Sequence, residues 1–310
     1  MAVVWILFGL IVLVLVAAFA VFMMTFYAPR RKPVGQADYP IPPGDIYLPH
    51  RDQMVAWMKE TRATPHTAMS ITSVDGLTLR GNYYEYAPGA PVELMIHGYR
   101  GTAERDLCGG MQRAFALGHS VLTVDQRASG LSDGHVITFG IRESRDCLAW
   151  IEHLRSTLGN DVKIYLTGIS MGAATVLTAA GHELPPHVVG ILADCGYSTT
   201  RDIIKKVIRQ LHLPADLLYP LVRLGARLYG RFDPEETSPL DAMKRCRVPV
   251  IFFHGDTDDY VPCDMSRENY EACTAKKRLV VVPGAGHGLA FVIDQDGYIA
   301  ALREFWNEHN

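Results

Sequence analysis

Hydrophobic and polar positions follow two different patterns along this chain. The first is one continuous apolar run, because Ala2 to Met24 is 23 positions without a charged residue. A helix of that length measures roughly 34 Å, which is enough to cross the hydrocarbon core of a bilayer. The run has no polar positions at helical spacing, unlike a helix on the core of a soluble domain. The pattern therefore predicts an N-terminal transmembrane helix.

A cleaved signal peptide is the alternative for this segment. Ala18-Phe19-Ala20 resembles a cleavage site, but the apolar run continues past it and no basic region precedes the run. Arg30-Arg31-Lys32 follows directly, and such clusters stay in the cytoplasm. We therefore expect a single-pass membrane protein whose C-terminal body is cytoplasmic. Whether the segment is retained or cleaved stays open at this point.

The second pattern begins near residue 67, where short apolar runs alternate with helical periodicity. Strands are expected at 67–73, 77–86, 92–96, 120–124, 162–167, 188–193, 248–253 and 279–282. Helices are expected at 51–62, 105–117, 141–158, 170–182 and about 291–308. Buried apolar strands that alternate with helices predict an α/β fold, with a mostly parallel sheet covered by helices on both faces. Val74-Asp75-Gly76 adds an antiparallel hairpin at one edge.

Two segments depart from this alternation. Residues 33–66 begin with a proline-rich stretch, which predicts a stiff, extended tether followed by a short lead-in. Residues from about 199 to 245 are helical in character but interrupted by prolines, and we interpret them as a helical cap inserted over a site. The chain is thus expected to comprise an anchor with its basic flank (1–32), the tether and lead-in (33–66), and one domain (67–310).

Composition narrows the classes of function. The net charge of −3 and the pI of about 6.5 do not indicate a basic surface that could bind nucleic acid, so we expect no nucleic-acid partner. The six cysteines form no C-x-x-C pair and show no zinc spacing. They are expected to be buried, reduced thiols, and no metal or cofactor is predicted from them.

The strongest chemical signal is Gly168-Ile169-Ser170-Met171-Gly172, which follows an apolar run and opens a helix. This is the G-x-S-x-G nucleophile elbow in the strand–turn–helix context that it requires. Such a turn holds the serine in strained backbone geometry, and flanking glycines avoid a collision across the turn. We therefore predict Ser170 as a nucleophile. The alternative is a glycine-rich turn that only lets a helix approach the sheet.

A serine hydroxyl is a poor nucleophile and needs a base. After this elbow the acid and the histidine follow the serine in chain order. His287 lies among glycines just after the strand 279–282 and is the candidate base, although a hydrogen-bonded loop histidine is the alternative. The carboxylate that orients the base is expected from Asp256, Asp258 or Asp259. A metal site shared with His254 is a further alternative for this loop, but its spacing matches no ligand motif.

The chain from about residue 67 to 310 resembles the α/β-hydrolase superfamily. It is most similar to bacterial hydrolases of the serine aminopeptidase-like family, near enzymes of the monoacylglycerol-lipase type. The matching stretches are His97-Gly98-Tyr99-Arg100-Gly101, residues 125–132, the elbow 168–172, Asp194-Cys195-Gly196-Tyr197, the acidic loop and Gly286-His287. In that family the aspartate precedes two residues and then Val-Pro, so the resemblance selects Asp258, ahead of Val261-Pro262.

The resemblance also implies the donors of an oxyanion hole. These are the backbone N–H of Met171, after the nucleophile, and that of Tyr99, after His97-Gly98. A plain turn that ends the strand is the alternative for His97-Gly98. Many relatives read Arg-Gly-His-Gly where this chain has Arg127-Ala128-Ser129-Gly130. That loop is usually structural, and we expect Arg127 to form an ion pair with Asp125.

These observations together predict a serine hydrolase that cleaves a carboxylic ester or related acyl bond through an acyl-enzyme, without a cofactor. A lipid-like acyl substrate is favoured by the anchor and by apolar cap residues, namely Leu217, Leu218, Leu221 and Leu224. An aminopeptidase-type amide hydrolase, with Glu235 or Glu236 holding a free amine, and an acyltransferase remain alternatives. The alternative outside enzymes is a catalytically silent, membrane-proximal binding scaffold.

Overall fold

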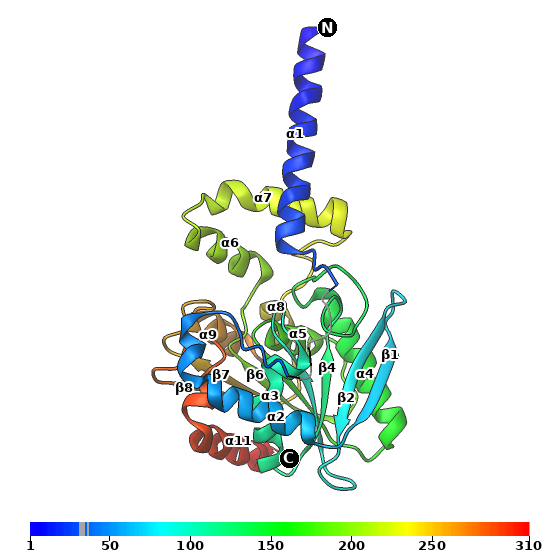
Figure 1. The fold of residues 1–310 in the computed structure, drawn as a ribbon, viewed down its shortest axis with the longest axis vertical. Coiled ribbons are helices and arrows are strands. Elements are labelled where there is room, and N and C mark those ends of the chain that lie inside the picture. Colours follow the sequence, from blue (N-terminus) through cyan, green and yellow to red (C-terminus); the bar gives the residue numbers. More distant parts are fainter. Residues whose placement is uncertain (31–34, 36, 310) are drawn as a thin grey trace.

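A mostly parallel sheet lies at the centre of the protein, whose computed structural model describes residues 1–30, 35 and 37–309 (Figure 1). The sheet has eight strands in the order β1-β2-β4-β3-β5-β6-β7-β8. The strands are β1 (Thr67–Thr72), β2 (Thr78–Tyr84), β3 (Val92–Ile96), β4 (Ser120–Asp125), β5 (Ile164–Ile169), β6 (Val188–Asp194), β7 (Val250–Gly255) and β8 (Lys277–Val282). β1 and β2 form the expected antiparallel hairpin, and β3 to β8 are parallel. The predicted α/β architecture is confirmed.

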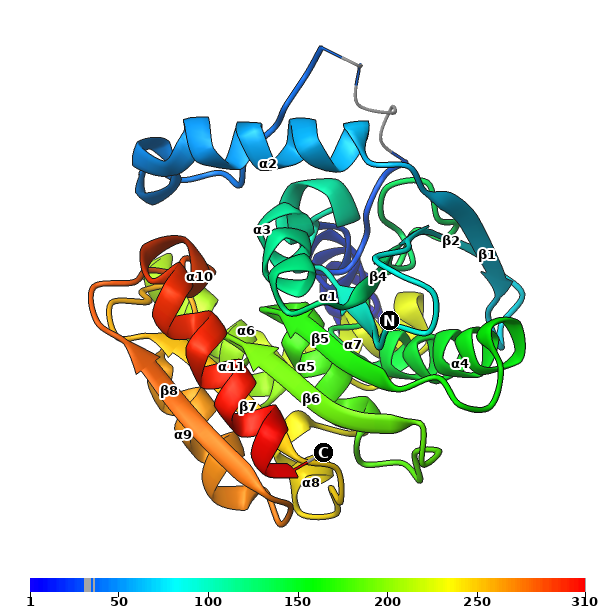
Figure 2. The same ribbon diagram turned by 90° about the horizontal axis from the view of Figure 1, so that it is seen from below.

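Helices cover both faces of this sheet (Figure 2). The helices of the described chain are α1 (Ala2–Thr25), the 3-10 helix η1 (Asp45–His50), α2 (Arg51–Ala63), α3 (Ala103–Ala116), α4 (Ile141–Leu158), α5 (Met171–Ala179), α6 (Thr200–Gln210), α7 (Ala215–Gly225), the π-helical turn η2 (Ala226–Gly230), α8 (Pro239–Met243), α9 (Cys263–Ala272), α10 (Ala290–Ile293) and α11 (Gln295–His309). α3 and α11 lie on one face, and α4, α5 and α9 lie on the other.

Burial of both faces explains why the central strands are mainly apolar. All five residues of β3 are buried, and their side chains alternate between two cores. Leu94 and Ile96 pack with α4 and α5, whereas Met95 packs with α3 on the opposite face. Side chains of a strand point alternately to its two sides, so a strand with helices on both sides needs residues that can be buried at every position. The one charged residue of β3, Glu93, is buried with Arg113 and His119 as its partners.

Two expected elements differ from the structure. The single closing helix is divided into α10 and α11, because Asp294 leaves helical geometry (φ −136°, ψ 76°) and its carboxylate accepts a hydrogen bond from the N–H of Gly297. A short acidic side chain in that position is a favourable start for a new helix. The prediction of an extended tether is also wrong at the C-terminal end of that segment. There η1 forms, and Tyr47 is buried against Met54, Met58 and Leu289.

The N-terminal helix α1 docks on the domain at its C-terminal end. Residues 1–16 are exposed, whereas Ala18, Phe22 and Phe26 are buried against α7 and the loop before α4. A Cβ at Gly225 would lie 2.5 Å from the carbonyl oxygen of Ala18, so this glycine permits the close approach of α7. The N–H of Ala28 then donates a hydrogen bond to the carbonyl of His135. Arg31, Lys32 and Pro33, which were assigned to the basic flank and the tether, lie outside the described residues.

Candidate active site

Ser170 lies at the turn between β5 and α5 with a left-handed backbone (φ 57°, ψ −118°). Such a conformation is costly for a residue with a side chain, and it persists only where the surroundings impose it. A Cβ at Gly168 would lie 2.1 Å from the carbonyl oxygen of Gly172, and one at Gly172 would lie 2.0 Å from that of Ile96. The two glycines therefore let the turn close, as the pattern predicted, and Ser170 remains 8% exposed.

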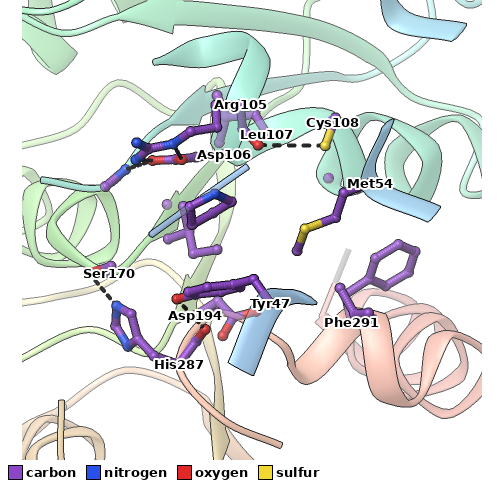
Figure 3. A pocket seen from close by; sticks show the side chains of 18 of the residues that line it. Tyr47, Met54, Arg105, Asp106, Leu107, Cys108, Ser170, Asp194, His287 and Phe291 are labelled. Atoms are coloured by element: carbon purple, nitrogen blue, oxygen red, sulfur yellow. Dashed lines mark hydrogen bonds and ion pairs between the residues drawn. The ribbon is translucent and has the colours of Figure 1, made fainter. Parts of the chain in front are cut away.

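His287 links the serine to Asp258, and Figure 3 shows its contact with Ser170. Its Nε2 lies 2.9 Å from Ser170 Oγ, and its Nδ1 lies 2.7 Å from Asp258 Oδ2. The three side chains come from the ends of β5, β7 and β8, which meet at the carboxyl edge of the sheet. A hydroxyl, an imidazole and a carboxylate in this order can deprotonate the hydroxyl and stabilise the resulting imidazolium.

Asp258 is held as a carboxylate by a set of donors. Its Oδ1 accepts hydrogen bonds from the N–H groups of Tyr260 (2.9 Å) and Val261 (2.8 Å). Burial raises the pKa of Asp258, but hydrogen bonds from His254, His287 and Val261 outweigh burial, so its pKa lies below the usual range. The carboxylate is therefore charged at neutral pH, as a residue that orients an imidazole must be.

The other acids of the loop have different roles. Asp256 accepts a hydrogen bond from the N–H of Gly284 at 2.7 Å, which joins this loop to the loop that carries His287. The backbone carbonyl of Asp259 accepts hydrogen bonds from Lys206 and Gln210 of α6. Only Asp258, of these three acids, has its carboxylate against the imidazole of His287.

His254 is a residue whose role the sequence did not reveal. It is fully buried, and its Nε2 lies 2.8 Å from the carbonyl oxygen of Val261 and 3.2 Å from Asp258 Oδ2. Its Nδ1 lies 2.7 Å from Ser266 Oγ of α9. The ring therefore fixes the acidic loop from behind. In the sequence it was a histidine at the end of an apolar strand, and the one role considered for it was in a metal site whose spacing matches no ligand motif.

The two expected oxyanion donors flank Ser170. Met171 is the first residue of α5, and the first N–H groups of a helix have no partner within it. Tyr99 follows Gly98, whose backbone is so close to the elbow that a Cβ there would lie 3.5 Å from Ser170 Cβ. The N–H of Tyr99 donates no hydrogen bond to another described residue. Both N–H groups are thus available beside the serine.

The prediction that Arg127 forms an ion pair with Asp125 is wrong. Arg127 instead makes paired hydrogen bonds with Asp146 of α4, both at 2.7 Å, and with Asp75 of the β1–β2 hairpin. Asp125 accepts the N–H groups of Ala103 and Leu131, both at 2.9 Å. β4 ends at Asp125 and Arg127 lies in the turn after it, so the regular alternation of a strand no longer relates the two side chains, and proximity along the chain was a poor guide to pairing.

A cavity of about 460 Å³ opens beside Ser170 and His287 (Figure 3). Its apolar wall comes mainly from the lead-in, α3 and α10, with side chains that include Tyr47, Met54, Trp57, Leu107, Phe291 and Val292. Among the described residues that line it, none belongs to the segment 199–245. The lead-in therefore supplies part of the wall of this cavity, and the expectation that the segment 199–245 covers the site stays a prediction. Tyr47 also donates a hydrogen bond of 3.0 Å to the carbonyl of His287.

The group of side chains that could hold a metal in the structure differs from the group that the sequence suggested. In the described chain, ligand atoms of Cys195, Asp258 and His287 lie within 4.8 Å of one another. Burial raises the pKa of the Cys195 thiol well above its usual value, so Cys195 is a neutral thiol in this structure. The carboxylate and the imidazole are already bonded to each other. This group therefore fits proton transfer better than metal coordination.

Comparison with known proteins places this fold in a family. The model of the alpha/beta hydrolase family matches residues 94–302, which is more than half of the chain. The chain belongs to this family. The narrower likeness to serine aminopeptidase-like and monoacylglycerol-lipase-type enzymes stays a prediction.

Several proteins are similar to this α/β hydrolase. Protein YqkD of Bacillus subtilis is 28% identical over 247 residues, which is 79% of this chain and 80% of that protein. Among solved structures, esterase Pf2001 of Pyrococcus furiosus has a TM-score of 0.67 and 20% identity, covering 90% of this chain and 99% of its own. Est1E of Butyrivibrio proteoclasticus, with ferulic acid bound, has a TM-score of 0.59 and 22% identity, covering 78% and 98%. At these identities the two structures establish the fold.

Proposed function

We propose that this α/β hydrolase is a membrane-anchored serine hydrolase that cleaves a carboxylic ester through an acyl-enzyme on Ser170. The observation that carries the proposal is the continuous set of contacts from Ser170 Oγ to His287 and from His287 to Asp258. Its placement in a family of hydrolases, and the likeness in fold to esterases, support the same reaction.

The reaction follows from the roles of these groups. His287 Nε2 takes the proton of Ser170 while Oγ attacks the ester carbonyl carbon, and the carbonyl oxygen becomes an oxyanion between the N–H groups of Tyr99 and Met171. His287 then gives the proton to the leaving alcohol, which departs and leaves an acyl-serine. A water molecule attacks that ester with His287 again as base, which releases the acid and restores Ser170. Each oxyanion donor contributes about 3–4 kcal/mol to the transition state.

The cavity favours an ester over an aminoacyl substrate. Glu235 and Glu236, which an aminopeptidase reading would use to hold a free amine, face Arg223 and Arg145. The acids that do line the cavity are also engaged: Asp106 pairs with Arg105, and burial raises the pKa of Asp194. A cationic amine therefore meets no free carboxylate among the described residues of the cavity, whereas the apolar wall suits an acyl chain or an aromatic ring. An acyltransferase would use the same acyl-serine with an alcohol in place of water.

The membrane location is a part of the same proposal. α1 is the one helix in the described chain that is long and apolar enough to cross a bilayer. We place it as a single transmembrane span with the hydrolase domain in the cytoplasm, as the basic residues after it favour. The docking of residues 18–28 on the domain supports a retained helix, since cleavage at Ala18-Phe19-Ala20 would remove Ala18 from its buried position against Gly225.

A steady-state screen of full-length protein in detergent micelles tests this function. The substrates are p-nitrophenyl esters of increasing acyl length and, beside them, aminoacyl-naphthylamides, with Ser170→Ala as the matched control. We expect hydrolysis of at least one ester by wild type and none by the variant, with naphthylamides untouched. Faster cleavage of the naphthylamides would favour the aminopeptidase. The silent binding scaffold predicts that wild type and Ser170→Ala are equally inert toward every substrate.

A further inference from the structure

The outer face of α7 carries an unusual row of leucines. Leu217, Leu221 and Leu224 are spaced by about one turn along α7, and Leu228 continues the row in η2. Leu217 is 74% exposed and Leu228 is 47% exposed, whereas Leu221 and Leu224 are half-buried. Leu211 and Leu213, in the turn before α7, are exposed next to the start of this row. We call these six side chains the leucine face.

The leucine face points away from the hydrolase domain. Ala215, Tyr219, Val222 and Ala226, on the opposite side of the same helix, are buried. α6 packs under α7, and the leucines line no part of the cavity that holds Ser170. The helix is therefore apolar on two opposite sides, of which one is buried and the other is only partly covered within the described chain. A surface helix of a soluble protein is normally polar on its outer side.

The helix α1 crosses α7 beside this face (Figure 1). The contact is close at Gly225, and the hydroxyl of Tyr229 donates a hydrogen bond of 3.0 Å to the carbonyl of Leu15. The ring of Tyr229 also packs on Phe19, with ring centres 5.1 Å apart. Any bilayer that α1 crosses must therefore end close to α7.

The length of α1 fixes where that bilayer ends. On the N-terminal side of its contact with Tyr229, at Leu15, α1 has only the 13 residues from Ala2 to Val14. These measure about 20 Å, whereas the hydrocarbon core is about 30 Å thick. The missing distance of about 10 Å equals the diameter of one helix with its side chains. The bilayer closes this gap if it extends down along α1 to include the outer side of α7.

A thinned bilayer is the other way to close the gap. Mismatch costs a fraction of a kcal/mol per Å, so about 10 Å would cost several kcal/mol. Burial of the leucine face acts in the opposite direction, because each leucine that leaves water contributes up to about 1.5–3 kcal/mol. The energetic comparison favours leucines in the membrane over a thin membrane above them.

We propose that α7 lies in the plane of the cytoplasmic membrane surface, with the leucine face inserted between lipid headgroups and acyl chains. The proposal rests on the transmembrane placement of α1 in the proposed function. It makes the segment 199–245 a second membrane contact, which fixes the orientation of the domain against the bilayer. Tyr229 lies at the depth where aromatic side chains are favoured. Lys206 and Gln210 of α6 connect this contact to the loop of Asp258 through the carbonyl of Asp259.

Depth-dependent fluorescence quenching of full-length protein tests the proposal. The protein carries Cys263→Ser, since Cys263 is half-buried and the other five cysteines are buried. Single cysteines are then introduced as Leu217→Cys, Leu228→Cys, Leu7→Cys in α1 and Asn160→Cys. Asn160 is exposed beyond α4, at the edge of the sheet opposite to α1. Each variant is labelled with nitrobenzoxadiazole and reconstituted in phosphatidylethanolamine–phosphatidylglycerol vesicles that contain nitroxide lipids.

We expect quenching at Leu217→Cys and Leu228→Cys at a depth about 5–10 Å below the headgroups. Leu7→Cys should be quenched most by nitroxides deep in the acyl chains, and Asn160→Cys should not be quenched. Quenching at Leu7→Cys with none at the two α7 positions would overturn this inference alone. Disulfide-linked pairs of Leu217→Cys chains in place of quenching would also overturn it, because the face would then join two copies. No quenching at Leu7→Cys would remove the membrane placement as well, whatever the ester assay shows.

Discussion

The hydroxyl of Tyr99 donates a hydrogen bond of 2.7 Å to the carbonyl oxygen of Thr25, the last residue of α1. The guanidinium of Arg100 donates to the carbonyls of Met24 and Tyr27, both at 2.9 Å. The end of α1 and the loop with a proposed oxyanion donor therefore form one hydrogen-bonded unit. The N-terminal helix is therefore bonded to a loop that lines the cavity, although no residue of α1 lines the cavity itself.

Tyr99→Phe should lower kcat for an ester roughly five- to tenfold with little change in KM. The variant keeps the backbone N–H but loses a hydrogen bond of about 1 kcal/mol that positions it. Tyr229→Phe is the matched control, because it also removes a hydrogen bond to a carbonyl of α1 but lies outside the cavity. Steady-state kinetics of both variants check this. Equal losses in both would mean that α1 stabilises the protein as a whole without positioning the loop.

His254→Gln should lower kcat by about 10²-fold, the usual effect of a displaced catalytic geometry. Burial raises the pKa of Asp258, but a hydrogen bond from His254 acts in the opposite direction and helps to keep that pKa low. Its loss should raise that pKa, so the acid limb of the pH–rate profile should move to higher pH. A profile that keeps its shape while the folded fraction falls would assign His254 a structural role only.

Tyr47→Phe tests whether the lead-in belongs to the site. The loss of its hydrogen bond to the carbonyl of His287 should lower kcat/KM up to about tenfold. Leu48→Ala, at the exposed neighbouring position, should leave ester hydrolysis unchanged. If the two substitutions had the same effect on kcat/KM, the lead-in would not shape the site.

The lowered pKa of Glu93 predicts how the free energy of unfolding depends on pH. Burial raises its pKa, but Arg113 and His119 outweigh burial and lower the pKa to about 2. A carboxyl with a lowered pKa in the folded state stabilises the fold above its unfolded pKa of about 4.3, and this contribution is lost as pH falls toward 2. Thermal unfolding in micelles from pH 7 to pH 3 should show this loss. Glu93→Gln should be less stable by about 3–5 kcal/mol at pH 7, because Arg113 stays buried without its partner.

The sequence predicted the features that depend on local patterns. The mainly apolar strands, the β1–β2 hairpin and the glycines around Ser170 all follow from the chemistry of a few adjacent residues. The convergence of Ser170, Asp258 and His287 followed from chain order and family resemblance, since spacing alone left three aspartates open. The carboxyl ends of parallel strands share one edge of a sheet, so residues that end different strands meet there.

Contacts between distant segments were not predictable in the same way. Arg127 pairs with Asp146 and Asp75 across the sheet edge, which no local pattern indicates. The segment 199–245 looked like a cover for the site because it is helical and apolar. Its leucines point away from the cavity, and the proline-rich lead-in, which looked like a linker, supplies Tyr47. Apolar content shows that a surface needs a partner but not which partner it has.

The most direct test of the catalytic assignment is covalent labelling with a fluorophosphonate, which phosphonylates an activated serine. Full-length wild type and Ser170→Ala are incubated with the probe in micelles, and adducts are located by peptide mass spectrometry. The account predicts one adduct per chain on Ser170 in wild type and none in Ser170→Ala, with both proteins equally folded by circular dichroism. Equal labelling of the two proteins, or an unmodified Ser170 in a folded wild type, would contradict it.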